Sequence, residues 1–332
     1  MLNLKYFLVF AAISIVSCDV YVPQEYWNAK PMSQHPKFQE KMQQITTDVV
    51  KSEHDPFIIG GSPAVRGQFP HFVLMLEIYP NNTAYVCGGS LIRRDWVLTS
   101  AFCIDKVAIY FDLYTGIVNI TGPAAWGTRV NHADTHIHPQ YNEDFIMNNI
   151  AMVKLIEAPD NLLSYPYTGI IELPTVAVNL VGLLGSISGF GITNENATYA
   201  SNDLRYGSLR VITNTVCAMY FRPGTIVDSD MCAETNGTVS TCSSDMGGPF
   251  SIVTNGVNRL EGVTSFYSSA GCEHGQPVGF TRVSSFLGWI DDVIAGRNPE
   301  DPWDILRDLQ EQYLVTLQNI IEGSNSLVHD EN

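Results

Sequence analysis

Three short strings are the places where this chain offers residues for chemistry: TSAFC at 99–103, NNIAMVKL at 148–155 and SDMGGP at 244–249. A serine hydroxyl becomes a nucleophile when a neighbouring imidazole takes its proton and a buried carboxylate orients that imidazole. Phe102 has no basic nitrogen, and the thioether of Met246 cannot donate or lose a proton. Asn149 accepts a hydrogen bond but carries no charge. As they stand, the three strings predict no route for proton transfer.

The same strings resemble the catalytic motifs of the trypsin/chymotrypsin family of serine proteases. Phe102 stands where that family carries His, Asn149 where it carries Asp, and Met246 where it carries Ser. The resemblance covers about 58–294 and includes seven further strings in family order, which are Ile58-Ile59-Gly60-Gly61, Cys87-Gly88-Gly89-Ser90-Leu91-Ile92, Trp96-Val97-Leu98-Thr99, His138-Pro139-Gln140-Tyr141-Asn142, Gly189-Phe190-Gly191, Phe280-Thr281-Arg282-Val283 and Gly288-Trp289-Ile290.

The body of the chain alternates short β-branched or aromatic runs with turn residues, a pattern typical of an all-β sandwich or barrel. Candidate strands include 72–78, 97–99, 107–110, 151–155 and 262–266. The resemblance narrows the expectation to two six-stranded antiparallel barrels followed by a terminal helix. We expect a signal peptide at 1–18, a propeptide-like segment at 19–57, the protease-like domain at 58–295 and an acidic helical tail at 296–332.

The resemblance also places the substrate site. Ser240 corresponds to the base of the primary pocket, and Tyr267 and Val278 replace glycines of its walls. These bulky side chains are expected to narrow the pocket, although a Tyr267 that points to solvent is the alternative. Ser244 replaces a glycine of the oxyanion hole, where a serine disfavours the required backbone geometry.

Asp245 is retained before the missing nucleophile. In the family this carboxylate pairs with the new N-terminal amine after activation, so the resemblance implies a pair between Ile58 and Asp245. Phe57 precedes the junction, where family zymogens commonly carry Arg or Lys. The chain is therefore either cut by a chymotrypsin-like enzyme or left uncut. Before this junction, Phe38, Met42, Ile45 and Val49 recur at helical spacing and predict a short amphipathic helix.

The cysteines indicate an oxidising compartment. Lys5 precedes an apolar run that ends near Cys18, which is typical of a secretory signal and too short for a membrane span. Cleavage there leaves six of the seven cysteines, an even number. The resemblance implies the pairs Cys87–Cys103, Cys217–Cys232 and Cys242–Cys272. Four sequons permit glycosylation, at Asn81, Asn119, Asn196 and Asn236.

The tail is the second unusual feature. Leu306, Leu309, Tyr313, Leu317 and Ile320 form one apolar stripe on a helix predicted over 302–322. The stripe either docks on the body of the chain or forms a surface for a partner or for self-association. A net charge of −16 disfavours nonspecific binding to nucleic acid. We expect no membrane span, no cofactor and no metal site, because the cluster of His132, His136 and His138 lacks further ligands at suitable spacing.

These patterns predict a secreted protein that is not an enzyme and acts by protein binding, as a cofactor, decoy or regulator of proteolysis. Its partner would be another protease or a substrate of one. Two alternatives remain open: a weak or unconventional serine-type endopeptidase, and a structural or secretory glycoprotein.

Overall fold

A computed structural model describes residues 20–46, 61–193, 196–235, 239–272 and 274–297. The expected signal peptide, Ile58, Asn236 and the 302–322 helix lie outside the described residues. Within the described part of the chain, no helix has the length and apolar content needed to cross a membrane.

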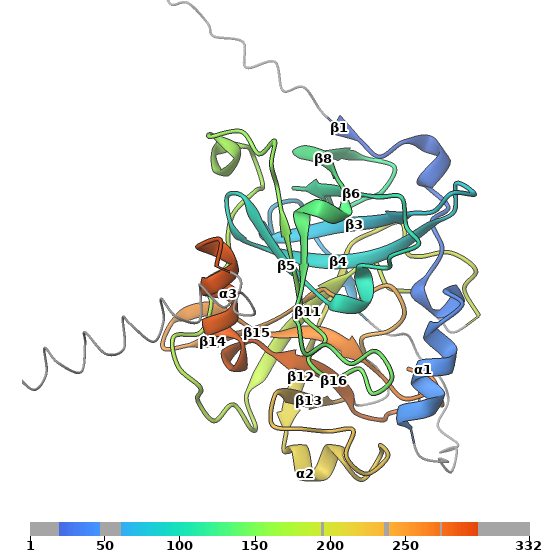
Figure 1. Cartoon of the computed structure of the whole chain (residues 1–332), viewed down its shortest axis with the longest axis vertical. Helices are drawn as coiled ribbons and strands as arrows, with labels where there is room; N and C mark the ends of the chain where they lie inside the picture. The colour runs from blue at the N-terminus through green and yellow to red at the C-terminus, as the bar shows by residue number, and fades with distance from the viewer. Residues whose placement is uncertain (1–19, 47–60, 194–195, 236–238, 273, 298–332) are drawn as a thin grey trace, which may run out of the picture.

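The first half of the body forms a curled antiparallel sheet of seven strands (Figure 1). In spatial order these are β8 (Trp126–Val130), β6 (Tyr110–Thr115), β3 (Phe72–Ile78), β4 (Ala84–Arg93), β5 (Trp96–Thr99), β10 (Ala151–Lys154) and β9 (Thr135–Ile137). Strand β3 is buried along its whole length because its alternate residues face two different cores. Val73 and Met75 belong to the core shared with the second half, whereas Leu74 and Leu76 belong to a separate one.

The second half forms a closed barrel. Its strands are β11 (Leu184–Gly189), β14 (Pro249–Thr254), β15 (Val257–Phe266), β16 (Val278–Arg282), β13 (Asp230–Glu234) and β12 (Arg205–Ile212), with β2 (Ser62–Pro63) added beside β12. Pairing of β11 with β12 joins the two ends of this sheet. The all-β, chymotrypsin-like fold is thus confirmed. The candidate strand at 107–110 was placed too early, since β6 begins at Tyr110 and the Val107 N–H instead bonds the Asp105 side chain, at 3.0 Å.

Helices are few and short: α1 (Phe38–Ile45), α2 (Asn214–Cys217) and α3 (Leu287–Ile294), with 3-10 turns at Gln24–Tyr26, Met32–Gln34, Ala101–Cys103, His132–Asp134, Leu162–Ser164 and Val283–Ser285. Helix α3 packs Trp289, Ile290 and Val293 against the body. The three expected disulfides, Cys87–Cys103, Cys217–Cys232 and Cys242–Cys272, are confirmed. Closing loops of 16, 15 and 30 residues, each stabilises the fold by roughly 2–4 kcal/mol.

The N-terminal segment, residues 20–46, lies along one side of both halves, and we call it the strap (Figure 1). It begins with β1 (Val20–Tyr21), which pairs with β7 (Pro123–Ala124) beside the first half. It ends with α1, after which Thr46 bridges Phe221 of the second half. The predicted amphipathic helix is present, with Phe38, Met42 and Ile45 buried, while Val49 lies outside the described residues.

Candidate functional site

The three substituted positions lie together where the two halves of the body meet. The Phe102 N–H donates to Asn149 Oδ1 at 2.9 Å, and Asn149 Nδ2 donates to Ser265 Oγ at 2.9 Å. Thr281 Oγ1 donates to the Asn149 carbonyl at 2.9 Å. Asn149 is fully buried, so its amide satisfies both neighbours that would otherwise lack partners. Hydrogen bonds to the side chain and to the carbonyl therefore fix an uncharged residue at this buried position.

Met246 sits on a tight loop that packs against β4. Its carbonyl accepts a hydrogen bond from the Gly88 N–H at 2.7 Å. Gly247 follows with a φ of 78°, and a Cβ placed there would lie 2.4 Å from the Gly88 carbonyl oxygen. Ser244 precedes this turn with a φ of 77°, a region that disfavours side chains other than glycine. Ser244 thus has a positive φ although it carries a side chain, and its buried Oγ has no hydrogen-bond partner among the described residues.

The residues predicted for the substrate pocket are all buried. Ser240 Oγ donates to the Thr241 carbonyl at 2.8 Å. Tyr267 and Val278 belong to the same hydrophobic core as Met246. Tyr267 is only 8% exposed, so it does not point into solvent.

The strap covers this region. The Phe38 ring lies between Phe102, at 5.7 Å between ring centroids, and Tyr267, at 5.4 Å. Five residues earlier, the Ser33 N–H donates to Ser243 Oγ beside the Met246 loop. One strap residue thus contacts both Phe102, a predicted triad position, and Tyr267, a residue predicted to line the pocket. A cavity of about 560 Å³ remains beside the strap, lined among others by His35, Phe102 and Tyr141.

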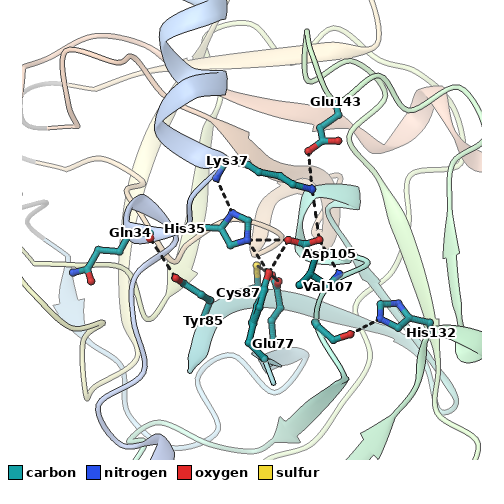
Figure 2. Close-up of polar contacts among 12 residues, drawn as sticks. Gln34, His35, Lys37, Glu77, Tyr85, Cys87, Asp105, Val107, His132 and Glu143 are labelled. Atoms are coloured by element: carbon teal, nitrogen blue, oxygen red, sulfur yellow. Dashed lines mark hydrogen bonds and ion pairs between the residues drawn. The ribbon is translucent and has the colours of Figure 1, made fainter. Parts of the chain in front are cut away.

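A cluster of buried polar side chains anchors the strap in the first half (Figure 2). His35 Nε2 lies 3.0 Å from Asp105 Oδ2 and 2.7 Å from the Tyr79 hydroxyl. His35 Nδ1 accepts the Lys37 N–H at 3.4 Å, which leaves Nε2 as the nitrogen that carries the proton. Lys37 Nζ lies 3.6 Å from Asp105 and 3.5 Å from Glu143.

The pKa values of the two buried carboxyl groups in this cluster, Glu77 and Asp105, are shifted in opposite directions. Burial, then the charge of Asp105, raises the pKa of Glu77 well above its usual range. Burial alone would also raise the pKa of Asp105. Hydrogen bonds from His35, the Val107 N–H and Tyr79 outweigh that effect and hold the Asp105 pKa below its usual value. The nearest side-chain partners of the Asp105 carboxylate are therefore the Tyr79 hydroxyl, which donates to Oδ2 at 2.8 Å, and His35 Nε2 at 3.0 Å.

Asp245 is held by backbone donors. The Gly191 N–H donates to Oδ1 and the Cys242 N–H to Oδ2, each at 2.8 Å. Burial raises the pKa of this carboxyl to about 6, against the opposing effect of the two N–H donors. The side chain is enclosed by protein, and the surface that it still exposes opens into a cavity of about 20 Å³, which Gly61 also lines. Such a volume holds about one water molecule.

The other predicted positions are placed as follows. Asn81 and Asn196 are exposed, and Asn119 is half-buried with its Nδ2 donating to Asp203 at 2.6 Å. His136 packs against Trp96, and His138 packs against Phe286 and Trp289. These two histidines therefore contact aromatic rings rather than each other.

Sequence reasoning missed His35, Glu77 and Asp105. A usable signal was the single acidic residue in the apolar run Phe72–Ile78, because a carboxyl on a strand buried on both faces requires polar partners. The partners come from separate segments of the chain, and no short motif links them.

The comparisons with known proteins agree on the family. The family model described as Trypsin matches residues 58–290. The chain belongs to the trypsin family. Brachyurin of Leptuca pugilator is 34% identical over 70% of this chain and 96% of its own length. Collagenase of Hypoderma lineatum is 36% identical over 70% of this chain and 85% of its own. A solved structure titled "HL collagenase" matches with a TM-score of 0.60 at 34% identity, covering 72% of this chain and 98% of that one.

These relatives correct one prediction. The expectation that this trypsin-family chain is not an enzyme is contradicted, because relatives at 30–36% identity, chymotrypsin-like elastase family member 1 among them, carry the names of enzymes. The side chains of Phe102, Asn149 and Met246 alone were not enough to predict that the chain has no enzymatic activity. In such enzymes, binding and the oxyanion hole still accelerate hydrolysis by roughly 10³–10⁴-fold over water after triad members are removed.

Proposed function

We propose that this trypsin-family chain is secreted and acts by binding other proteins, as a cofactor, decoy or regulator of proteolysis. The observation that carries the proposal is Phe38, which fills the space between Phe102 and Tyr267. Because the strap occupies this space, a partner protein binds either on the outer surface of the body or in the place of the strap. A second protease, or a substrate of one, is the proposed partner.

Secretion is supported by the cysteines. The described residues hold three disulfides, which form and persist in oxidising compartments. The apolar run before Cys18 supplies the proposed signal, and the exposed sequons at Asn81 and Asn196 are accessible to glycosylation.

Cleavage after Phe57 is the proposed switch. The new Ile58 amine would pair with Asp245, whose pKa is raised by burial and which has no cationic partner in the described part of the chain. N-terminal sequencing of secreted material tests this step. A start near Asp19 in every molecule would rule the switch out.

A weak or unconventional serine-type endopeptidase is the second candidate, and the names of the relatives favour it. A fluorophosphonate probe and a chymotrypsin-type peptide assay separate the two, each run on uncut chain and on chain cut after Phe57. Stoichiometric labelling with turnover supports the endopeptidase. Specific capture of a protease or its substrate from the native fluid, without labelling, supports the binding function. If no protein is captured specifically and no labelling occurs, the remaining alternative is a structural or secretory glycoprotein.

Self-association through 302–322 stays a proposal. Truncation after Asn298 tests it by native mass in solution: a loss of dimer identifies the tail as the interface. An unchanged mass together with an unchanged set of captured partners would defeat it.

A further inference from the structure

The strap is bound through its main chain on both sides of the stretch 31–44, and these two places are the ends of the bound segment. The Lys30 N–H donates to the Ala84 carbonyl at 2.8 Å, and the Lys30 carbonyl accepts the Val86 N–H at 3.1 Å. At the other end, the Ile45 carbonyl accepts the Arg222 N–H at 2.8 Å. Such contacts hold any chain of the right shape, which is how extended peptides are bound at sheet edges. Selectivity must come from the side-chain sockets between the two ends.

The first socket receives His35. Asp105 supplies its buried negative charge, and the Tyr85 ring packs edge-on against the imidazole at 5.1 Å between centroids (Figure 2). Glu77 and Tyr79 complete the floor, and Glu143 lies at the rim, where it contacts Lys37 of the strap at 3.5 Å. A buried charge without a hydrogen-bond partner is costly. A flat ring with an N–H donor satisfies both the carboxylate and the aromatic wall.

The second socket receives Phe38, three residues further along the chain. Its walls are Phe102 and Tyr267, and the Phe38 side chain is fully buried between them. His35 has an extended backbone just before α1 begins at Phe38, and the rings of both residues lie 5.7 Å from the Phe102 ring between centroids, so the two sockets are adjacent. The groove therefore reads a short segment with an imidazole at one position and an aromatic ring three positions later.

We propose that the groove beneath the strap is a peptide-recognition site for a segment of a partner protein with this His-x-x-aromatic pattern, and that the strap is its internal stand-in. The inference rests on the proposed binding function and names the chemistry of the partner. A tethered segment competes at high effective concentration, so the partner segment enters after the strap has been cut from the body.

The test uses the full-length chain with a site for a specific protease placed between residues 50 and 56, cut after folding. A fluorescent peptide of residues 29–46 is titrated into cut and uncut chain, with strap release followed by native mass spectrometry. We expect binding to cut chain only. Peptides carrying His35→Ala or Phe38→Ala should bind at least about tenfold more weakly. A peptide with Gln43→Ala is the matched control, since Gln43 is exposed on the same helix, and it should bind within about twofold of the unchanged peptide.

Equal binding by the unchanged, His35→Ala and Phe38→Ala peptides would overturn the inference. So would a released strap with no binding of the unchanged peptide, or a cut strap that never exchanges, because a partner would then have no access. Because only the peptides vary, the fold of the body is the same in every titration.

Capture from the native fluid separates this inference from the proposed function. If a partner is captured but the unchanged peptide does not displace it, the binding function stands and the His-x-x-aromatic recognition site is ruled out. If the peptides bind with the expected selectivity but no partner is captured, the selectivity of the groove stands and the proposed binding function falls.

Discussion

Two single residues of the site, Asn149 and Ser244, show how local contacts and backbone shape are set by individual side chains. Asn149 accepts the Phe102 N–H and donates to Ser265, so it satisfies its two neighbours without charge. Ser244 keeps a backbone conformation that glycine adopts more easily, with a φ of 77°.

The strain at Ser244 predicts a stabilising substitution. Ser244→Gly should raise the free energy of unfolding by about 1 kcal/mol, because it removes an unfavourable positive φ and a buried hydroxyl without a partner. Chemical denaturation measures the change. Ser188→Gly is the matched control: it removes an equally unpartnered buried hydroxyl from strand β11, where glycine is unfavourable. A Ser244→Gly variant no more stable than Ser188→Gly would show that the turn carries no strain.

Asp245 predicts a pH dependence of stability. Its folded pKa of about 6 lies above the ordinary value of 3.8. The folded state therefore binds this proton more tightly than the unfolded state between those pH values, and the free energy of unfolding falls as pH rises from about 4 to about 6. The loss is at most about 3 kcal/mol, since each pKa unit corresponds to about 1.4 kcal/mol.

Asp245→Asn should abolish this part of the pH slope in uncut chain, and denaturation at pH 4, 5, 6 and 7 measures it. Cutting after Phe57 should also reduce the slope, because pairing with a cation lowers the pKa of a carboxyl. Identical pH profiles of the Asp245→Asn and unchanged proteins would contradict the raised pKa.

At the level of elements, the strap shows what a pattern of residues can and cannot predict. Spacing of Phe38, Met42 and Ile45 predicted helix α1 and its buried face. Periodicity specifies which face is buried but not the surface against which it packs, so the contact with Phe102 and Tyr267 was not foreseen. The resemblance to the trypsin family predicted the three disulfides correctly, since the order of the motif strings places the cysteines. The His35–Asp105 contact joins residues 70 apart in sequence, which no local pattern encodes.

Phe38 predicts local release of the strap. Phe38→Ala removes a fully buried ring, a change that costs about 3–5 kcal/mol in protein cores. The strap contributes few of the strand contacts of the body, so the expected effect is local opening rather than global unfolding. Limited proteolysis should cut the variant within 20–46 at least about tenfold faster than the unchanged chain.

Gln43→Ala, on the exposed side of α1, should be cut at the unchanged rate. Equal cutting of the Phe38→Ala and unchanged chains would mean that Phe38 does not hold the strap. Cutting that spreads through the body of the variant would instead show that strap and body unfold as one unit.

At the scale of the whole molecule, a curled sheet and a closed barrel meet at the site, and the strap spans both (Figure 1). Its first part pairs with β7 and β4 of the first half, and its last part bonds Arg222 of the second. A segment anchored on both halves controls access to the space between them. The trypsin-family body thus forms the groove, and the strap occupies it.

The occupancy of the groove by the strap is tested most directly by photo-cross-linking in solution. A benzophenone amino acid placed at position 38 of the full-length chain, in place of Phe38, should cross-link within the same molecule to peptides that contain Phe102 or Tyr267, as identified by mass spectrometry. The same group at Gln43 should give neither product. Cross-links from position 38 that reach neither peptide would contradict the placement of the strap and the binding function argued from it.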